Sequence, residues 1–249
     1  MLRAATDDAT DPVWPRADAD VRWGIGAAMA CFLGAQVLAG VWATIVVASF
    51  FVDGLPELAD RPMWALPVLG IGLWAGYLGG PILINRLSGS GPMLDFDLRV
   101  SPAQAAMAAV IGVAMQLAVL PPLYWVIERF VTTDPSETAE AIVGAADGLL
   151  DVVLLVFAVV IMAPLAEEWF YRGMVLSSLV RRIGPIAGAV ISSAVFALIH
   201  LELILLPGLF LLALVLAWLT MRIGRVGVAI VAHLAFNATT VVQLLVFGA

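Results

Sequence analysis

A succession of long apolar segments separated by short polar ones constrains the fold of this chain more than any other feature. Most of these segments reach or exceed the roughly 20 residues that a helix needs to cross a bilayer. With 63% hydrophobic and 12% charged residues, the composition also lies far from that of soluble domains. The sequence therefore predicts an all-α, polytopic membrane protein with about seven transmembrane helices, at residues 23–52, 63–85, 102–126, 148–182, 186–200, 203–221 and 226–247.

Three parts of the chain differ in composition. Residues 1–21 are acidic and have too little apolar surface to fold alone, so we expect a disordered cytoplasmic tail. This tail lacks the basic start and short apolar core of a signal peptide, and we expect it to stay on the protein. Residues 22–146 supply the first helices and loops, and residues 147–249 form the helical core that carries the candidate site.

Two local patterns predict structure in residues 22–146. Glycines 72, 76 and 80 recur every four residues, a spacing that lets another helix backbone approach closely. Asp134, Pro135, Ser136 and Glu137 are typical of an N-cap, a first-turn proline and a capping-box acid. A surface helix is therefore predicted to begin at Asp134.

Arginine is the only basic residue type in the chain, apart from its two histidines, and its distribution predicts the orientation. With a cytoplasmic N-terminus, nine loop arginines fall inside and two fall outside, the positive-inside pattern. The inner set is Arg3, Arg16, Arg22, Arg86, Arg99, Arg181, Arg182, Arg222 and Arg225, and the outer set is Arg61 and Arg129. We expect an integral protein of a bacterial cytoplasmic membrane, N-terminus inside and C-terminus outside. The net charge of −7 argues against nucleic-acid binding, and membrane lipid is the expected surrounding.

Six polar side chains stand out in the apolar helices and mark a candidate site. Placing an ionisable side chain inside a membrane has a free-energy cost, so such residues are candidates for a functional site by default. Glu167 and His200 lie almost equally far along the chain from the turn at Gly184, so an antiparallel helix pair would bring them level. The last helix brings two more polar groups to similar depth. The full set is Glu167, Glu168, Arg172, His200, His233 and Asn237.

These residue types in this arrangement fit hydrolysis. A carboxylate and a neutral imidazole can hold and activate one water molecule, the predicted role of Glu167 and His200. An imidazole and a carboxamide one helical turn apart can stabilise an oxyanion, the predicted role of His233 and Asn237. Glu168 and Arg172, four residues apart, would form an ion pair. Glu167 would then be left as the working carboxylate.

The residues leave alternatives open. Glu167, His200 and His233 are also a ligand set that catalytic zinc uses, although no His-Glu-x-x-His pair is present. We favour a mechanism with no required cofactor and keep a divalent metal such as zinc as the alternative. The polar groups would also suit a purely structural ion-pair cluster, a proton-coupled transporter, or a membrane protein that binds peptides or lipopeptides without cutting them. Against a transporter, no paired broken helices occur in corresponding halves of the chain.

Together, three motifs resemble those of the CPBP family of intramembrane proteases. They are Glu-Glu-x-x-x-Arg-Gly at 167–173, Phe-x-x-x-His at 196–200 and His-x-x-x-Asn at 233–237. The family includes CAAX prenyl endopeptidases, which remove the last three residues of prenylated proteins, and bacterial members linked to bacteriocin processing or immunity. It is often labelled an intramembrane metalloprotease family, although a glutamate-dependent mechanism without an obligatory metal is favoured for it.

The resemblance covers about residues 147–247 and implies an intramembrane endopeptidase acting on a peptide or protein substrate, lipidated proteins included. It assigns the catalytic carboxylate to Glu167 with His200 as its partner, and oxyanion stabilisation to His233 and Asn237. It assigns supporting roles to Glu168 and Arg172.

Overall fold

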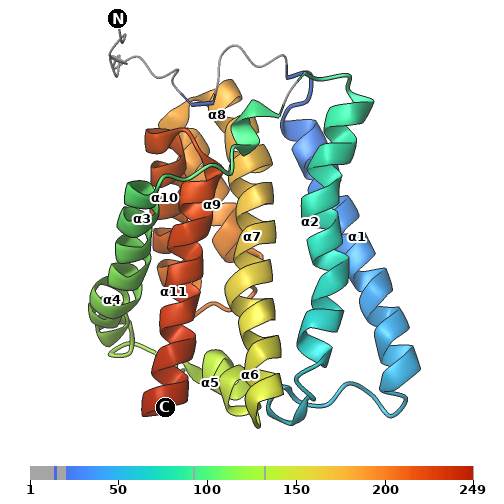
Figure 1. Ribbon diagram of the computed structural model, residues 1–249, viewed down its shortest axis with the longest axis vertical. Coiled ribbons are helices and arrows are strands. Elements are labelled where there is room, and N and C mark those ends of the chain that lie inside the picture. Colours follow the sequence, from blue (N-terminus) through green and yellow to red (C-terminus); the bar gives the residue numbers. More distant parts are fainter. Residues whose placement is uncertain (1–13, 16–20, 92, 132, 249) are drawn as a thin grey trace, which may run out of the picture.

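The computed structural model describes residues 14–15, 21–91, 93–131 and 133–248, and the regular structure in these ranges is entirely helical (Figure 1). Six of its helices are long and apolar enough to cross a membrane, so the chain is an all-α, polytopic membrane protein as predicted. They are α1 (Ile25–Phe50), α2 (Ala65–Leu87), the continuous α3–η3–α4 (Pro102–Ala114, Met115–Val119, Leu120–Ile127), the α6–α8 segment (Leu149–Ile183), α10 (Leu206–Ile223) and α11 (Val226–Phe247). Short 3-10 helices η1 (Leu58–Asp60) and η2 (Leu94–Phe96) lie in the connections.

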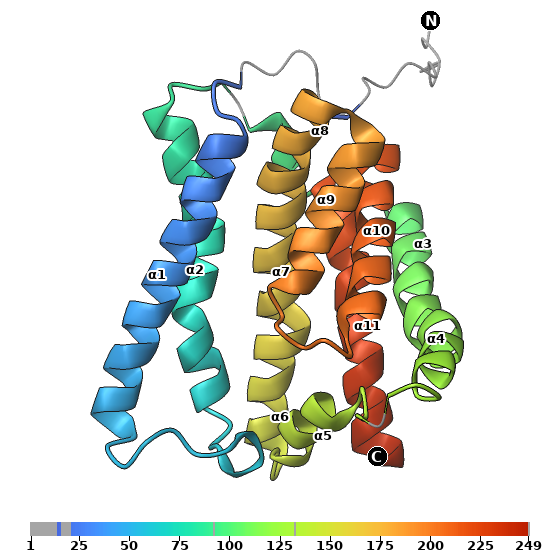
Figure 2. The ribbon, with the colours of Figure 1, turned by 180° about the vertical axis from the view of Figure 1, so that it is seen from behind.

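The fifth predicted span is shorter than the others. Helix α9 runs from Pro185 to Leu198, and its 14 residues span about 21 Å, less than the roughly 30 Å of a hydrocarbon core. It descends beside α8, and α10 then returns toward the same end of the molecule (Figure 2). All seven predicted segments are thus helical, and seven complete crossings remain a prediction.

The longest helix changes its winding on both sides of the paired glutamates. It consists of α6 (Leu149–Leu155), the π-helical η4 (Val156–Met162), α7 (Ala163–Glu168), the π-helical η5 (Trp169–Leu176) and α8 (Ser177–Ile183). π-helical turns are rare in proteins, and those that do occur are often found at functional sites. The helix ends at Gly184, whose φ of +84° favours glycine, as the predicted break requires.

Glycines bring α1 and α2 into close contact, as their spacing predicts. A Cβ at Gly72 would meet Trp42, a Cβ at Gly76 would meet Ala35, and a Cβ at Gly80 would meet Cys31. All three partners lie on α1. The two helices pack together as a pair, with their inner side facing α6–α8 (Figure 1).

The surface helix α5 begins later than predicted, at Glu137, and runs to Gly144. The carboxylate of Asp134 accepts hydrogen bonds from the backbone N–H of Ser136, at 2.8 Å, and from its hydroxyl. Asp134 therefore closes a turn before the helix instead of capping it, and Ser136 takes the N-cap position without a side-chain cap bond. The N-cap therefore lies two residues later than the predicted Asp134.

Described arginines gather at one end of the helices. The end where α1 begins carries seven of them and the opposite end carries Arg61 and Arg129. The seven are Arg22, Arg86, Arg99, Arg181, Arg182, Arg222 and Arg225. Arg3 and Arg16 lie outside the described residues, as does most of the predicted tail, although Trp14 is buried and packs near Leu176. Which membrane face holds the arginines remains a prediction.

Candidate active site

Glu168 is the centre of a buried polar cluster between the long helix and α11. Its side chain is fully buried, and its two oxygens have different partners. One oxygen, Oε2, lies 2.9 Å from Nε of Arg172, and the other, Oε1, lies 2.9 Å from Nδ1 of His233. Arg172 is itself 1% exposed, and its Nη2 donates to the carbonyl oxygen of Ala213 on α10 at 3.3 Å. Glu168 and Arg172 thus form the ion pair that their spacing suggests.

Glu167 lies in a different environment from its neighbour. It is partly exposed, and no ion pair or hydrogen bond of its carboxylate occurs in the described part of the chain. The carboxylate is within electrostatic range of both His200 and His233. Successive helical residues point about 100° apart, so Glu167 does not share the direction that brings Glu168 to Arg172 and His233.

Phe196 on α9 holds this cluster together by packing. Its ring is fully buried, and its centroid lies 4.9 Å from that of His200 and 6.0 Å from that of His233. The guanidinium carbon of Arg172 lies 4.9 Å from the same ring centroid. Phe196 therefore contacts both imidazoles and the ion pair's cation, and its π face stabilises that cation.

The hydrogen bonds at Nδ1 determine which nitrogen of each imidazole is available. In His200, Nδ1 lies 2.8 Å from the carbonyl oxygen of Phe196, which only accepts, so Nδ1 carries the proton. In His233, Nδ1 donates in the same way to the carboxylate of Glu168. Each neutral imidazole then keeps a lone pair at Nε2, which can bind a water proton or a metal ion.

His200 lies just beyond the last residue of α9, in an unusual stretch of backbone. The next residue, Leu201, has φ of +58°, the left-handed region that leucine rarely adopts. Such strain persists only where the surrounding structure over-determines it, and it is concentrated at functional sites. Because α9 ends at Leu198, before it could cross a whole bilayer, the chain turns at His200 and Leu201 part of the way along the neighbouring helices.

Asn237 has a structural contact of its own. Its Nδ2 donates to the carbonyl oxygen of Val159 in η4 at 2.8 Å. The widened η4 turn leaves such carbonyls without an ordinary α-helical partner, and a side chain from α11 supplies one. Asn237 lies one turn from His233 on α11, and one of its amide protons remains uncommitted in the described contacts.

The zinc alternative would use Glu167, His200 and His233 as ligands. One carboxylate and two imidazole Nε2 atoms are suitable donors, but within the described residues no group of three such side chains lies close enough to hold one ion. We therefore derive no catalytic step through a metal.

Sequence reasoning missed a set of aromatic residues beside Glu167. Tyr77 of α2 and Tyr171 of η5 are fully buried, and their hydroxyl oxygens lie 2.9 Å apart. Phe170 stacks on Tyr77, with ring centroids 4.6 Å apart, and Tyr171 packs edge-on against Phe196. Two tyrosine hydroxyls within apolar helices were the available signal, because buried phenols usually find a partner.

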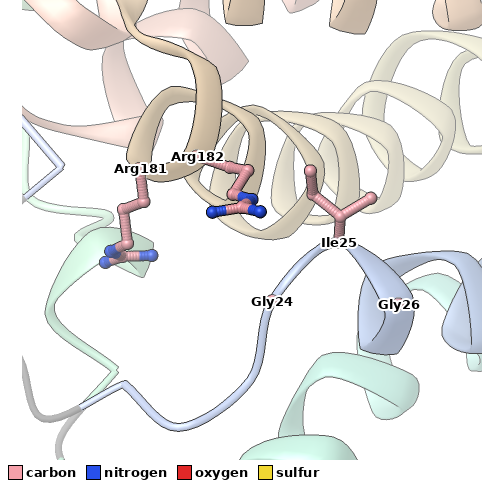
Figure 3. Close-up of a pocket in the computed structure, with 5 residues that line it drawn as sticks. All are labelled: Gly24, Ile25, Gly26, Arg181 and Arg182. Carbon is pink, nitrogen blue, oxygen red and sulfur yellow. The ribbon is translucent and has the colours of Figure 1, made fainter.

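An open pocket of about 410 Å³ lies at the end of the molecule where α8 meets α1 (Figure 3). Gly24, Ile25, Gly26, Arg181 and Arg182 line it. Arg181 forms an ion pair with Asp95 of η2. None of the candidate catalytic residues lines this pocket, so it is separate from the buried cluster.

Comparison with known proteins bears directly on the helices that carry the cluster. Residues 149–239 match the family model described as type II CAAX prenyl endopeptidase Rce1-like. No curated protein and no solved structure gave a match. The matched region includes all three motifs, from the paired glutamates to His233 and Asn237. This match covers less than half of the chain, and it supports an assignment of the helices around the cluster to the CPBP family of CAAX proteases.

Proposed function

We propose that this protein is an intramembrane endopeptidase that hydrolyses a peptide bond with a water molecule activated by Glu167 and His200. One observation carries the proposal. Both carboxylate oxygens of Glu168 have partners, in Arg172 and His233, whereas the adjacent Glu167 has no ion pair in the described part of the chain and lies within electrostatic range of both imidazoles. Two adjacent carboxylates in such different surroundings suit different roles. The family match supports CAAX-type endopeptidase activity in general terms.

In the first step, Glu167 takes one proton from the water. The lone pair at Nε2 of His200 accepts a hydrogen bond from the same water and orients it. The resulting hydroxide adds to the carbonyl carbon of the scissile bond, and the carbonyl oxygen becomes an oxyanion. Glu167 then returns its proton to the leaving nitrogen as the C–N bond breaks, giving a carboxylate and an amine.

His233 and Asn237 stabilise the oxyanion in this proposal. This role requires the imidazolium form of His233 in place of the neutral form described above: Nδ1–H then stays on Glu168 and Nε2–H donates to the oxyanion. The second amide proton of Asn237 is the other donor, the first being held by Val159. Glu168 and Arg172 support the site by fixing the ring orientation of His233.

The substrate is a peptide or a protein reached within the membrane. The description of the matching family makes a prenylated protein C-terminus the first class to test. The arginine distribution supports a cytoplasmic N-terminus, and the location that we propose is a bacterial cytoplasmic membrane. No required cofactor is proposed, so chelators such as EDTA and 1,10-phenanthroline are expected to leave cleavage unchanged; loss of cleavage that zinc restores would favour the metal alternative.

The test is cleavage of a fluorogenic farnesylated peptide ending in Cys-Ala-Ala-Leu by the purified protein in detergent. Glu167→Gln and His200→Ala are each expected to lower kcat at least about 100-fold, the usual contribution of general acid–base groups. Glu137→Gln, which changes an exposed acid of α5, is the matched control and should leave kcat unchanged.

A parallel test identifies natural substrates. Membrane-associated peptides are compared between cells that carry the intact protein and cells that carry Glu167→Gln, and C-terminally shortened products should occur only with the former. Full activity in Glu167→Gln or His200→Ala would contradict the mechanism. Proton-coupled solute transport without peptide cleavage would support the transporter alternative instead.

A further inference from the structure

A hydroxyl network joins α1 and α2 to the helix that carries Glu167. Gln36 of α1 donates from Nε2 to the hydroxyl of Tyr77 at 3.1 Å, and the hydroxyls of Tyr77 and Tyr171 share a hydrogen bond of 2.9 Å. Both tyrosines are fully buried. Gln36 and Tyr77 lie outside the region that matches the family model.

A count of donors shows that one phenolic proton in this network has no acceptor. The hydroxyl oxygen of Tyr77 accepts a hydrogen bond from the amide of Gln36, and one of the two phenolic protons forms the hydrogen bond between the two hydroxyls. The other phenolic proton is left over, whichever tyrosine donates. Neither hydroxyl has a further hydrogen-bond partner within the described ranges. A buried donor without an acceptor is unfavourable by roughly 1–3 kcal/mol, so a nearby acceptor would satisfy it.

Glu167 is a carboxylate acceptor on the same helix as Tyr171. Tyr171 follows Glu167 by four residues, which places the two side chains on one face of the helix. The charge of Glu167 interacts electrostatically with both tyrosine hydroxyls. The ring of Tyr171 also packs against Phe196, which itself contacts His200, so the hydroxyl pair borders the same site.

We propose that Tyr77 and Tyr171 are positioning residues: their surplus hydroxyl proton donates to the carboxylate of Glu167 once that side chain turns toward the hydroxyl pair, and the bond aims the carboxylate at the water. Helix α2 thereby completes the site from outside the matched region. This inference rests on the proposed function for its effect on cleavage, whereas the hydrogen bond itself can be tested without any substrate.

Steric support for the hydroxyl pair comes from aromatic stacking and close helix packing. Phe170 stacks on Tyr77 with an interplanar angle of 3°, and Gly76 allows α1 to approach the backbone next to Tyr77. The rings are therefore held by contacts that do not involve their hydroxyls. Phenylalanine at either position keeps these contacts and removes only the hydrogen bond.

The first arm of the experiment measures cleavage of the farnesylated Cys-Ala-Ala-Leu peptide. Tyr77→Phe and Tyr171→Phe are each expected to lower kcat about 10-fold with KM unchanged, the effect of losing a hydrogen bond to a charged group. The double variant should be no slower than the slower single variant, because the two hydroxyls act as one unit. Tyr124→Phe, whose hydroxyl bonds the carbonyl oxygen of Leu205, is the matched control and should keep full activity.

The second arm needs no substrate. The chain has three tyrosines, so tyrosine labelled with ¹³C at Cζ gives three signals, which the three Tyr→Phe variants assign. Glu167→Gln is expected to shift the Tyr77 or Tyr171 signal and to leave that of Tyr124 in place. Unshifted Tyr77 and Tyr171 signals, or full kcat in both single variants, would overturn the inference. Absence of any Glu167-dependent cleavage would contradict the proposed function. In that case the Cζ signals by themselves would test whether a tyrosine hydroxyl bonds Glu167.

Discussion

At the scale of single residues, neighbouring contacts give two identical carboxylates different properties. Glu168 is enclosed with a cation and an imidazole, whereas Glu167 is partly exposed and faces the site. Ion pairing between Glu168 and Arg172 could be predicted from their spacing alone. The bond between Glu168 and His233 could not, because it depends on how α11 packs beside α7.

Removing the charge of Arg172 is expected to destabilise the protein strongly. Arg172→Met leaves Glu168 buried without its cation, which lowers the free energy of unfolding by about 3–5 kcal/mol. Denaturant unfolding in detergent, followed by circular dichroism, measures this. Arg182→Met, at an exposed arginine of α8, is the control and should change stability by less than about 0.5 kcal/mol. Equal, small effects of both substitutions would contradict a stabilising ion pair.

At the scale of helices, close packing explains several glycines. Gly173, the last residue of the Glu-Glu-x-x-x-Arg-Gly motif, has the ring of Phe96 where its Cβ would be. Gly112 of α3 similarly faces the carbonyl of Ala232 on α11, next to His233. The π-helical turns η4 and η5 were not predicted, because an apolar helical pattern has no distinct signature for one extra residue in a turn. They emerge where the long helix packs against several others.

A pair of glycines on α2 tests the importance of helix approach. Gly76→Ala places a methyl group against Ala35 of α1 and is expected to lower the unfolding free energy by about 1–3 kcal/mol through overpacking. Gly79→Ala meets open space and should raise it by about 0.5–1 kcal/mol, because alanine favours helix. Thermal unfolding of both variants in one detergent compares them. A gain in stability from Gly76→Ala would contradict close packing at this position.

At the scale of the whole molecule, the first helix begins and the last helix ends at opposite ends. Apart from the buried Arg172, the described arginines divide seven to two between these ends, in the sense predicted for a cytoplasmic N-terminus. The loop after α9 lies deeper than the other connections, and α5 contacts it where Thr138 donates to Glu202 at 3.0 Å. A surface helix thus contacts the loop that follows His200.

The orientation is testable because the chain has a single cysteine, Cys31. In a Cys31→Ala background, Asp60→Cys is expected to react with a membrane-impermeant maleimide on intact cells. Leu87→Cys, at the opposite end of α2, should react only after the membrane is permeabilised. The reverse labelling pattern would place the N-terminus outside.

The sequence by itself determined the membrane-spanning helical class, the break at Gly184, a close helix approach at the glycines of α2 and the candidate residues. These features depend on apolar length, local backbone preference and the rarity of charge in lipid. Only the tertiary structure decided that α9 ends early, that Glu168 bonds His233, and that Tyr77 meets Tyr171. Such contacts join residues far apart in the chain. Their geometry depends on how whole helices pack together, and a local sequence pattern does not predict that packing.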